Sequence, residues 1–168
     1  MQFPQTINRE AMEALTFIKK KENLIFYGPI GIGKTHLAIA LGLLVCEGNY
    51  TVRFYILIEL DIKLNEYYAK GKLERFINAL KKIDLLIVDE CGCLPTNLQA
   101  GRLLFRVIAD VYERHSLIIT TNIDFSKWSG IFSDTQMATA MVDRLAHHGH
   151  IFYFDGESYR LMHALMTQ

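Results

Sequence analysis

Residues 28–35 read Gly28-Pro29-Ile30-Gly31-Ile32-Gly33-Lys34-Thr35, and this segment indicates the class of the fold. It fits G-x-x-x-x-G-K-[ST], the P-loop, whose backbone N–H groups surround nucleotide phosphates. The glycines permit a tight turn and a close approach of the backbone to a phosphate. We expect Lys34 to reach the β- and γ-phosphates and Thr35 to bind Mg²⁺. His36, the next residue, joins the predicted nucleotide-binding set.

The sequence on either side supplies the strand and the helix that this motif requires. Residues 24–27 (LIFY) form a short apolar run of strand-forming residues. Residues 36–46 (HLAIALGLLVC) favour a helix, which Glu47-Gly48 would end. The alternative is a glycine-rich turn in front of an ordinary helix. The matching context on both sides favours the P-loop, with a nucleotide as its ligand.

Strands and helices alternate along the rest of the chain. Further strands are expected at residues 51–57, 84–89, 117–120 and 150–154. Helices are expected at residues 7–20, 61–80 (with a break at Gly71), 99–115, 135–147 and 159–166. The alternation predicts a three-layer α/β/α sandwich with a five-stranded, mainly parallel sheet. We expect one domain over residues 1–168, with an N-terminal helix within residues 1–22 and no room for a substantial C-terminal lid.

Composition excludes some classes of protein. The 168 residues carry a formal net charge of zero, so overall charge calls for neither nucleic acid nor an anionic membrane, although a local basic patch is still possible. The first ten residues are polar and mixed, unlike a signal peptide. The longest apolar runs, about ten residues, are too short to cross a bilayer. Three cysteines make an odd set, and free thiols suit a reducing compartment. We expect a cytoplasmic protein without a membrane partner.

An acidic pair follows the apolar strand at residues 84–89 (DLLIVD). A strand that ends in Asp places a carboxylate at the carboxyl edge of the sheet, where Asp89 would hold Mg²⁺ opposite Thr35. Glu90 could accept a proton from the attacking water, which indicates hydrolysis rather than transfer to an acceptor. The alternative is a solvated acidic turn. The position some fifty residues after a P-loop favours the catalytic interpretation.

Asn122 ends a second apolar strand, residues 117–122 (LIITTN). An amide beside the γ-phosphate could orient the water or sense hydrolysis. Asn is also a common turn residue. Together with the P-loop and the acidic pair, the polar strand end favours the first role.

Three weaker motifs follow in order: residues 125–128 (FSKW), 143–148 (DRLAHH) and 156–160 (GESYR). From about residue 7 to residue 160 the ordered set resembles the IstB family of transposon-encoded AAA+ ATPases, relatives of the DnaC and DnaI helicase loaders. The resemblance implies a P-loop NTPase of the AAA+/RecA-like (ASCE) class that uses ATP and Mg²⁺. It also implies self-association with ATP at the subunit interface, binding to DNA, and a transposase or a replicative helicase as partner.

The resemblance assigns roles to two arginines. Arg144 matches the family's arginine finger, which would reach ATP bound by a neighbouring subunit. Arg160 matches the family's second sensor position. The alternative for each is an ordinary surface or ion-paired arginine.

Two departures from the family pattern bear on function. Family members usually carry a helical N-terminal region for partner contacts, whereas this chain begins almost at the core. Cys91-Gly92-Cys93-Leu94-Pro95 stands where relatives have apolar residues, and we interpret both thiols as apolar substitutes.

A basic stretch is a candidate DNA surface, with a solvated helix face as the alternative. Its residues are Lys63, Lys70, Lys72, Arg75, Lys81 and Lys82.

The predicted function is an ATPase that assembles on DNA and assists a transposase or a helicase, with weak turnover when DNA or the partner is missing. One alternative is a nucleotide-binding interaction module with little hydrolysis. Another is a small P-loop kinase, against which the Asp89-Glu90 and Asp143-Arg144 pairs speak.

Overall fold

Five parallel strands form the centre of the molecule in a computed structural model, which describes residues 7–92, 98–112, 114–132 and 134–162. The order across the sheet is β2-β3-β4-β1-β5. The strands are β1 (Asn23–Tyr27), β2 (Val52–Ile56), β3 (Leu85–Cys91), β4 (Ser116–Thr121) and β5 (Gly149–Tyr153). Every described pair of neighbouring strands is parallel, so the predicted five-stranded sheet is confirmed.

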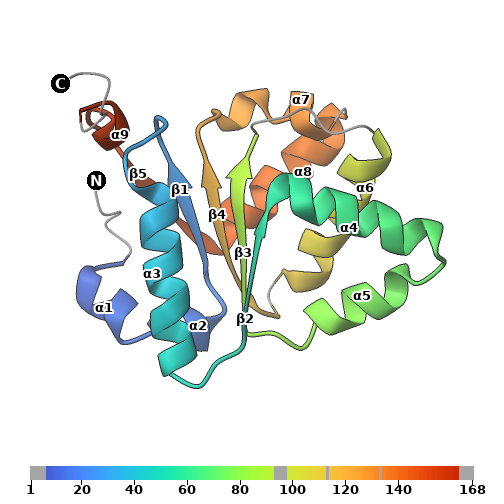
Figure 1. The fold of residues 1–168 in the computed structure, drawn as a ribbon, viewed down its shortest axis with the longest axis horizontal. Helices are drawn as coiled ribbons and strands as arrows, with labels where there is room; N and C mark the ends of the chain where they lie inside the picture. Colours follow the sequence, from blue (N-terminus) through green and yellow to red (C-terminus); the bar gives the residue numbers. More distant parts are fainter. Residues whose placement is uncertain (1–6, 93–97, 113, 133, 163–168) are drawn as a thin grey trace.

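Helices cover both faces of this sheet (Figure 1). One face carries α1 (Arg9–Glu13), α2 (Thr16–Lys20) and α3 (Lys34–Glu47). The other carries α4 (Leu57–Ala69), α5 (Leu73–Leu80), α6 (Leu98–Val111) and α8 (Thr135–His147). Three short elements complete the set: η1 (Phe125–Lys127), α7 (Ser129–Phe132) and α9 (Tyr159–Met162). Two buried apolar clusters, one on each face, confirm the three-layer sandwich.

Strand order brings the predicted functional segments to one edge. β4 lies between β1 and β3, with Ile119 paired in register with Ile25 on one side and Val88 on the other. Because all three strands run the same way, their carboxyl ends meet. The P-loop after β1, the acidic pair at the end of β3 and the polar residues at the end of β4 therefore share one edge of the sheet.

The prediction of a single helix within residues 1–22 is wrong, because α1 and α2 are two separate helices. The break falls at Leu15, whose φ of 54° is left-handed and cannot continue a helix. Leu15 is nevertheless buried, in the apolar cluster on the α3 face. Burial of this side chain outweighs the local cost of the left-handed conformation, which is about 1–2 kcal/mol.

The boundary between β2 and α4 also differs from the prediction. The strand ends at Ile56 and the helix begins at Leu57, whereas the sequence predicted a strand to residue 57 and a helix from residue 61. Leu57, Leu60 and Leu64 are all buried at helical spacing, so core contacts extend α4 by one turn.

Asp61 on α4 is an acidic side chain placed in an apolar setting. Its Oδ1 is buried and has no hydrogen-bond partner within the described part of the chain. Burial raises the pKa of Asp61 from its ordinary value near 3.8 to about 6. The folded state therefore binds this proton more tightly than the unfolded chain, and stability falls as pH rises through the interval between the two values.

We expect Asp61→Asn to stabilise the protein near neutral pH. The gain should be about 1–2 kcal/mol above pH 7, after allowance for the part of Asp61 that remains in contact with solvent. It should nearly vanish at about pH 4.5, where the folded wild type already holds the proton. Urea unfolding of both proteins at the two pH values measures this difference. An equal gain at both values would mean that the carboxylate charge is not its source.

Candidate functional site

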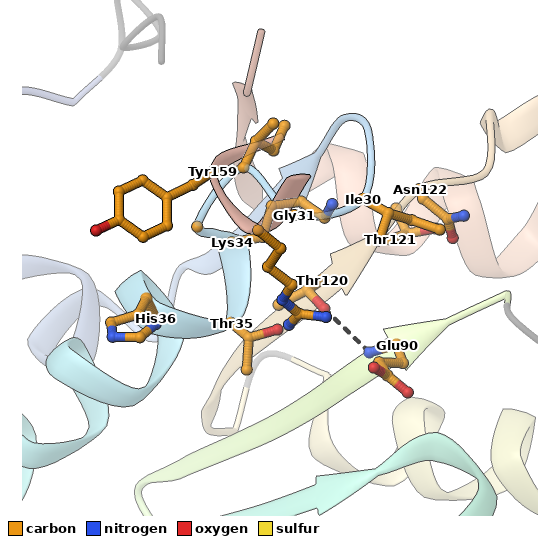
Figure 2. Close-up of a pocket in the computed structure, with 13 residues that line it drawn as sticks. Ile30, Gly31, Lys34, Thr35, His36, Glu90, Thr120, Thr121, Asn122 and Tyr159 are labelled. Carbon is orange, nitrogen blue, oxygen red and sulfur yellow. Dashed lines mark hydrogen bonds between the residues drawn. The ribbon is translucent and has the colours of Figure 1, made fainter. Parts of the chain in front are cut away.

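A pocket of about 670 Å³ opens at the carboxyl edge of the sheet (Figure 2). Its volume lies in the range of small-molecule sites. Its lining comes from the P-loop and the start of α3, from the ends of β3 and β4, and from α9. The lining residues are Ile30, Gly31, Ile32, Gly33, Lys34, Thr35, His36, Glu90, Thr120, Thr121, Asn122, Tyr159 and Arg160. Segments far apart in the sequence are thus brought together here, as the motifs predicted.

The P-loop has a conformation that requires glycine at two close approaches. A Cβ at Gly28 would lie 2.2 Å from the carbonyl oxygen of Phe154, and the φ of Gly28 is 152°. A Cβ at Gly31 would lie 2.1 Å from Oγ of Ser158, and its φ is 83°. Both contacts involve the segment after β5. The loop therefore packs so closely against that segment that a side chain has no space at Gly28 or Gly31.

Lys34 is buried, and its ammonium group is held by the loop itself. Its Nζ donates to the carbonyl oxygen of Gly28 at 2.7 Å and to that of Pro29. Gly28 and Pro29 also line a second, smaller hollow on the β5 side of the loop. The loop carbonyls thus hold a positive charge at the place where the motif predicts phosphates.

Asp89 is joined to two hydroxyl groups at the end of the sheet. Thr35 Oγ1 donates to Asp89 Oδ1 at 3.0 Å, and Thr120 Oγ1 donates to the same oxygen. Thr120 Oγ1 also accepts the backbone N–H of Glu90 at 3.0 Å, the dashed line in Figure 2. Hydroxyl and carboxylate oxygens are the ligands that Mg²⁺ prefers, so Thr35 and Asp89 fit the predicted metal site.

Glu90 occupies an irregular point of β3. The register between β3 and β4 shifts between Val88 and Cys91, and Glu90 has a left-handed φ of 59°. Consecutive residues of a regular strand point to opposite faces. The bulge interrupts this alternation: Asp89 accepts a hydrogen bond from the pocket-lining Thr35, and Glu90, the next residue, lines the same pocket. Backbone strain at a candidate catalytic residue is a recognised feature of functional sites.

The remaining predicted residues divide into two groups. Asn122, His36 and Arg160 line the pocket, as expected. Arg144 on α8 does not line it: its Cζ lies 4.9 Å from the centre of the Phe105 ring on α6. Its Nη1 is buried and has no hydrogen-bond partner among the described residues. Arg144 is thus absent from the lining of its own chain's pocket.

Sequence reasoning missed Thr120, Thr121 and Tyr159 as site residues. The two threonines directly precede Asn122 at the end of an apolar strand, which was a usable signal. Tyr159 adjoins Arg160 in the GESYR motif but carries no charge that would direct attention to it. Of the two thiols interpreted as apolar substitutes, Cys91 is buried, whereas Cys93 lies outside the described residues.

Comparison with known proteins gives a family match over nearly the whole chain. The sequence profile of the family described as IstB-like ATP binding protein matches residues 4–167. The protein of insertion sequence IS5376 from Geobacillus stearothermophilus that is named for ATP binding is 43% identical over 160 residues, which cover 94% of this chain and 64% of that protein. The corresponding IS21 protein of Pseudomonas aeruginosa is 41% identical over 150 residues, 89% of this chain and 57% of that protein. The chain thus spans less than two thirds of the length of these relatives.

Solved structures resemble this chain in fold. The DnaC helicase loader superposes with a TM-score of 0.71 at 19% identity, over 92% of this chain and 93% of that one. DnaA from Aquifex aeolicus bound to AMPPCP superposes with a TM-score of 0.70 at 21% identity, over 93% of this chain and 48% of that one. Within the described residues, no helix has the length and apolar character needed to cross a membrane.

Proposed function

The chain belongs to the IstB-like ATP-binding protein family, and from this premise we propose that it hydrolyses ATP with Mg²⁺ and assembles on DNA to assist a transposase or a replicative helicase. We take residues 1–168 as one ATPase core domain. One observation carries the proposal: Thr35, Asp89 and Thr120 form a hydrogen-bonded group between the P-loop and Glu90. A protein that only held nucleotide would not need an acid at that position.

The P-loop binds and orients the triphosphate in this proposal. Backbone N–H groups of the loop and the positive end of α3 face the phosphates, and Lys34 turns its ammonium from the loop carbonyls toward them. Thr35 and Asp89 would hold Mg²⁺, which would neutralise charge on the phosphates. Lys34 and Glu90 line the same pocket, so the γ-phosphate would lie between them.

Glu90 and Asn122 act on water. Both line the same pocket from the ends of neighbouring strands. Glu90 accepts a proton from the water that attacks the γ-phosphate, and the Asn122 amide orients that water. Thr120 is hydrogen-bonded to both the Glu90 backbone and the Asp89 side chain. It therefore fixes the position of the proposed base relative to the proposed metal ligand. Arg160 contacts the phosphates from the α9 side of the pocket.

Arg144 completes the site of a neighbouring subunit. A planar, permanently charged guanidinium suits the charge that builds on the γ-phosphate. Because Nη1 is buried against α6 in the single chain, the side chain has to change its conformation on assembly. Turnover by the isolated chain is therefore slow, and the relatives' insertion sequences suggest DNA and a transposase as the activating components. We also propose a cytoplasmic location, which the free thiols of Cys46 and Cys91 support.

The basic stretch gives limited support for a DNA surface. Lys70 is 3.5 Å from Glu66, Lys81 is 3.3 Å from Asp110, and Lys63 lies over the Tyr55 ring. These contacts engage the three lysine ammonium groups within the subunit, which leaves them less available for DNA phosphates. Lys72, Arg75 and Lys82 remain the stronger candidates for phosphate contacts in an assembly.

The test is ATP turnover measured across protein concentrations, with and without duplex DNA. Turnover per chain should rise with protein concentration and with DNA. Arg144→Ala should lower turnover in the assembled state roughly 1,000-fold, the scale of an arginine finger, while monomeric ATP binding stays unchanged. Arg114→Ala, which removes an exposed arginine near the end of α6, is the matched control.

Two results would contradict this scheme. Wild-type turnover that is independent of protein concentration, together with a fully active Arg144→Ala variant, would eliminate the finger in trans. Tight ATP binding without turnover under every condition would favour the interaction module.

A further inference from the structure

The two ends of the main pocket differ in chemistry. In Figure 2 the rings of Tyr159 and His36 lie at one side of the P-loop, and Glu90 and Asn122 lie at the other. Catalysis requires the γ-phosphate at the end that holds Glu90. The opposite end of a bound nucleotide must then point toward the aromatic side, because the P-loop holds the phosphates between the two.

Tyr159 is attached to the P-loop by its backbone. Its N–H donates to the carbonyl oxygen of Gly31 at 3.0 Å, and Gly31 is in turn pressed against Ser158. The position of this tyrosine is therefore set by the loop that holds the phosphates. Tyr159 therefore keeps a fixed position relative to the phosphates of a bound nucleotide. A residue that recognises the base requires such a fixed position.

Tyr159 is an exposed aromatic residue in the lining of the main pocket. The residue is 63% exposed although its backbone is fixed. A large exposed aromatic side chain at a pocket is a typical contact for a flat ligand. His36 adds a second ring at the first turn of α3, one residue after Thr35.

The smaller hollow on the β5 side of the P-loop is the competing location. It is about 370 Å³ in volume and has Tyr27 and Tyr153 in its lining. These two rings pack edge to face with centroids 5.9 Å apart, and Tyr27 also stacks on Phe125 at 6.4 Å. The Tyr27 ring is thus packed against both Tyr153 and Phe125, whereas Tyr153 remains exposed. The engaged Tyr27 ring and the smaller volume make this hollow less suited to a base.

We propose that Tyr159 is the base-stacking residue of the nucleotide site and that His36 lines the same base subsite. The inference rests on the proposed function, because it takes the P-loop to hold a nucleoside triphosphate. It adds a residue that reads the base rather than the phosphates. Stacking on one ring recognises any base by its flat face, with purines favoured by their larger area.

The experiment compares two probes on the full chain, ATP and inorganic tripolyphosphate, each with Mg²⁺ and measured by calorimetry. Tripolyphosphate has the phosphates but no base. Tyr159→Ala should weaken ATP binding roughly tenfold, the scale of one stacking contact, and leave tripolyphosphate binding unchanged. Tyr159→Phe should bind ATP like the wild type, because the ring face is kept.

Two exposed residues provide matched controls. Leu161→Ala removes a side chain that is 73% exposed from the same short helix, and Tyr153→Ala removes a tyrosine from the competing hollow. Both variants should bind ATP and tripolyphosphate like the wild type.

Three outcomes would overturn the inference. Unchanged ATP affinity in Tyr159→Ala would remove the stacking contact. An equal loss for both probes would show that Tyr159 supports the P-loop and not the base. A loss of ATP affinity in Tyr153→Ala alone would move the base to the other hollow. If the wild type bound neither probe, the proposed function itself would fail, which the phosphate-only probe makes distinguishable.

Discussion

Lys34→Ala should weaken ATP binding roughly 10- to 100-fold. The ammonium is the buried positive charge of the P-loop, and hydrogen bonds to charged groups contribute about 1.5–3 kcal/mol each. Its loss also leaves the carbonyl oxygens of Gly28 and Pro29 without this donor. Calorimetric titration with MgATP measures the effect.

Lys19→Ala provides the control, because it removes an exposed lysine from α2. Lys34→Met separates charge from packing, since the methionine keeps the apolar stem. We expect Met and Ala at this position to be similarly defective. ATP affinity that stays at the wild-type level in both would rule out a phosphate-binding role for Lys34.

Glu90→Gln should slow turnover by about 100-fold or more and leave ATP bound. The amide keeps the size and the backbone position of the side chain but cannot accept the proton of the attacking water, and general bases contribute about 100- to 10,000-fold. Single-turnover measurements in the assembled state separate this step from binding and from product release.

Glu47→Gln at the exposed end of α3 is the matched control and should turn over ATP like the wild type. Asp89→Asn offers a contrast, because it should impair Mg²⁺-dependent binding as well as turnover. Undiminished hydrolysis by Glu90→Gln would require another group to activate the water, and the scheme for Glu90 would then be wrong.

The fold was largely predictable because apolar periodicity is a local signal. Residues 24–27 and 84–89 are apolar runs bounded by polar residues, and both are strands within one residue or two of the expected bounds. The P-loop motif predicted a strand before it and a helix after it, which are β1 and α3. These features depend on neighbouring residues alone, so one sequence suffices to read them.

The exceptions arise from long-range packing. The left-handed Leu15 occurs because its side chain is buried against the α3 face, a contact that the local helix pattern does not contain. The short helix α7 packs against α6, where Gly101 lies against the Phe132 backbone. A Cβ at Gly101 would be 2.9 Å from the carbonyl oxygen of Phe132. The position of α7 therefore depends on a glycine in α6, which is distant in the sequence.

Site residues divide in the same way. Lys34, Thr35 and Asp89 belong to short motifs with a fixed geometry, so their positions could be anticipated. Thr120 bonds to Asp89 only because β4 is inserted between β1 and β3, and strand order is not written in any local pattern. The contact of Arg144 with Phe105 depends likewise on how α8 packs against α6.

The left-handed backbone of Glu90 means that activity and stability make opposite demands at this position. A residue with a Cβ costs about 1–2 kcal/mol in that conformation, and glycine would avoid the cost. Selection for a more heat-resistant domain alone would therefore favour glycine at position 90 and would remove the carboxylate with it. In the proposed mechanism the carboxylate at position 90 is needed for turnover, so engineering for thermostability should leave it untouched.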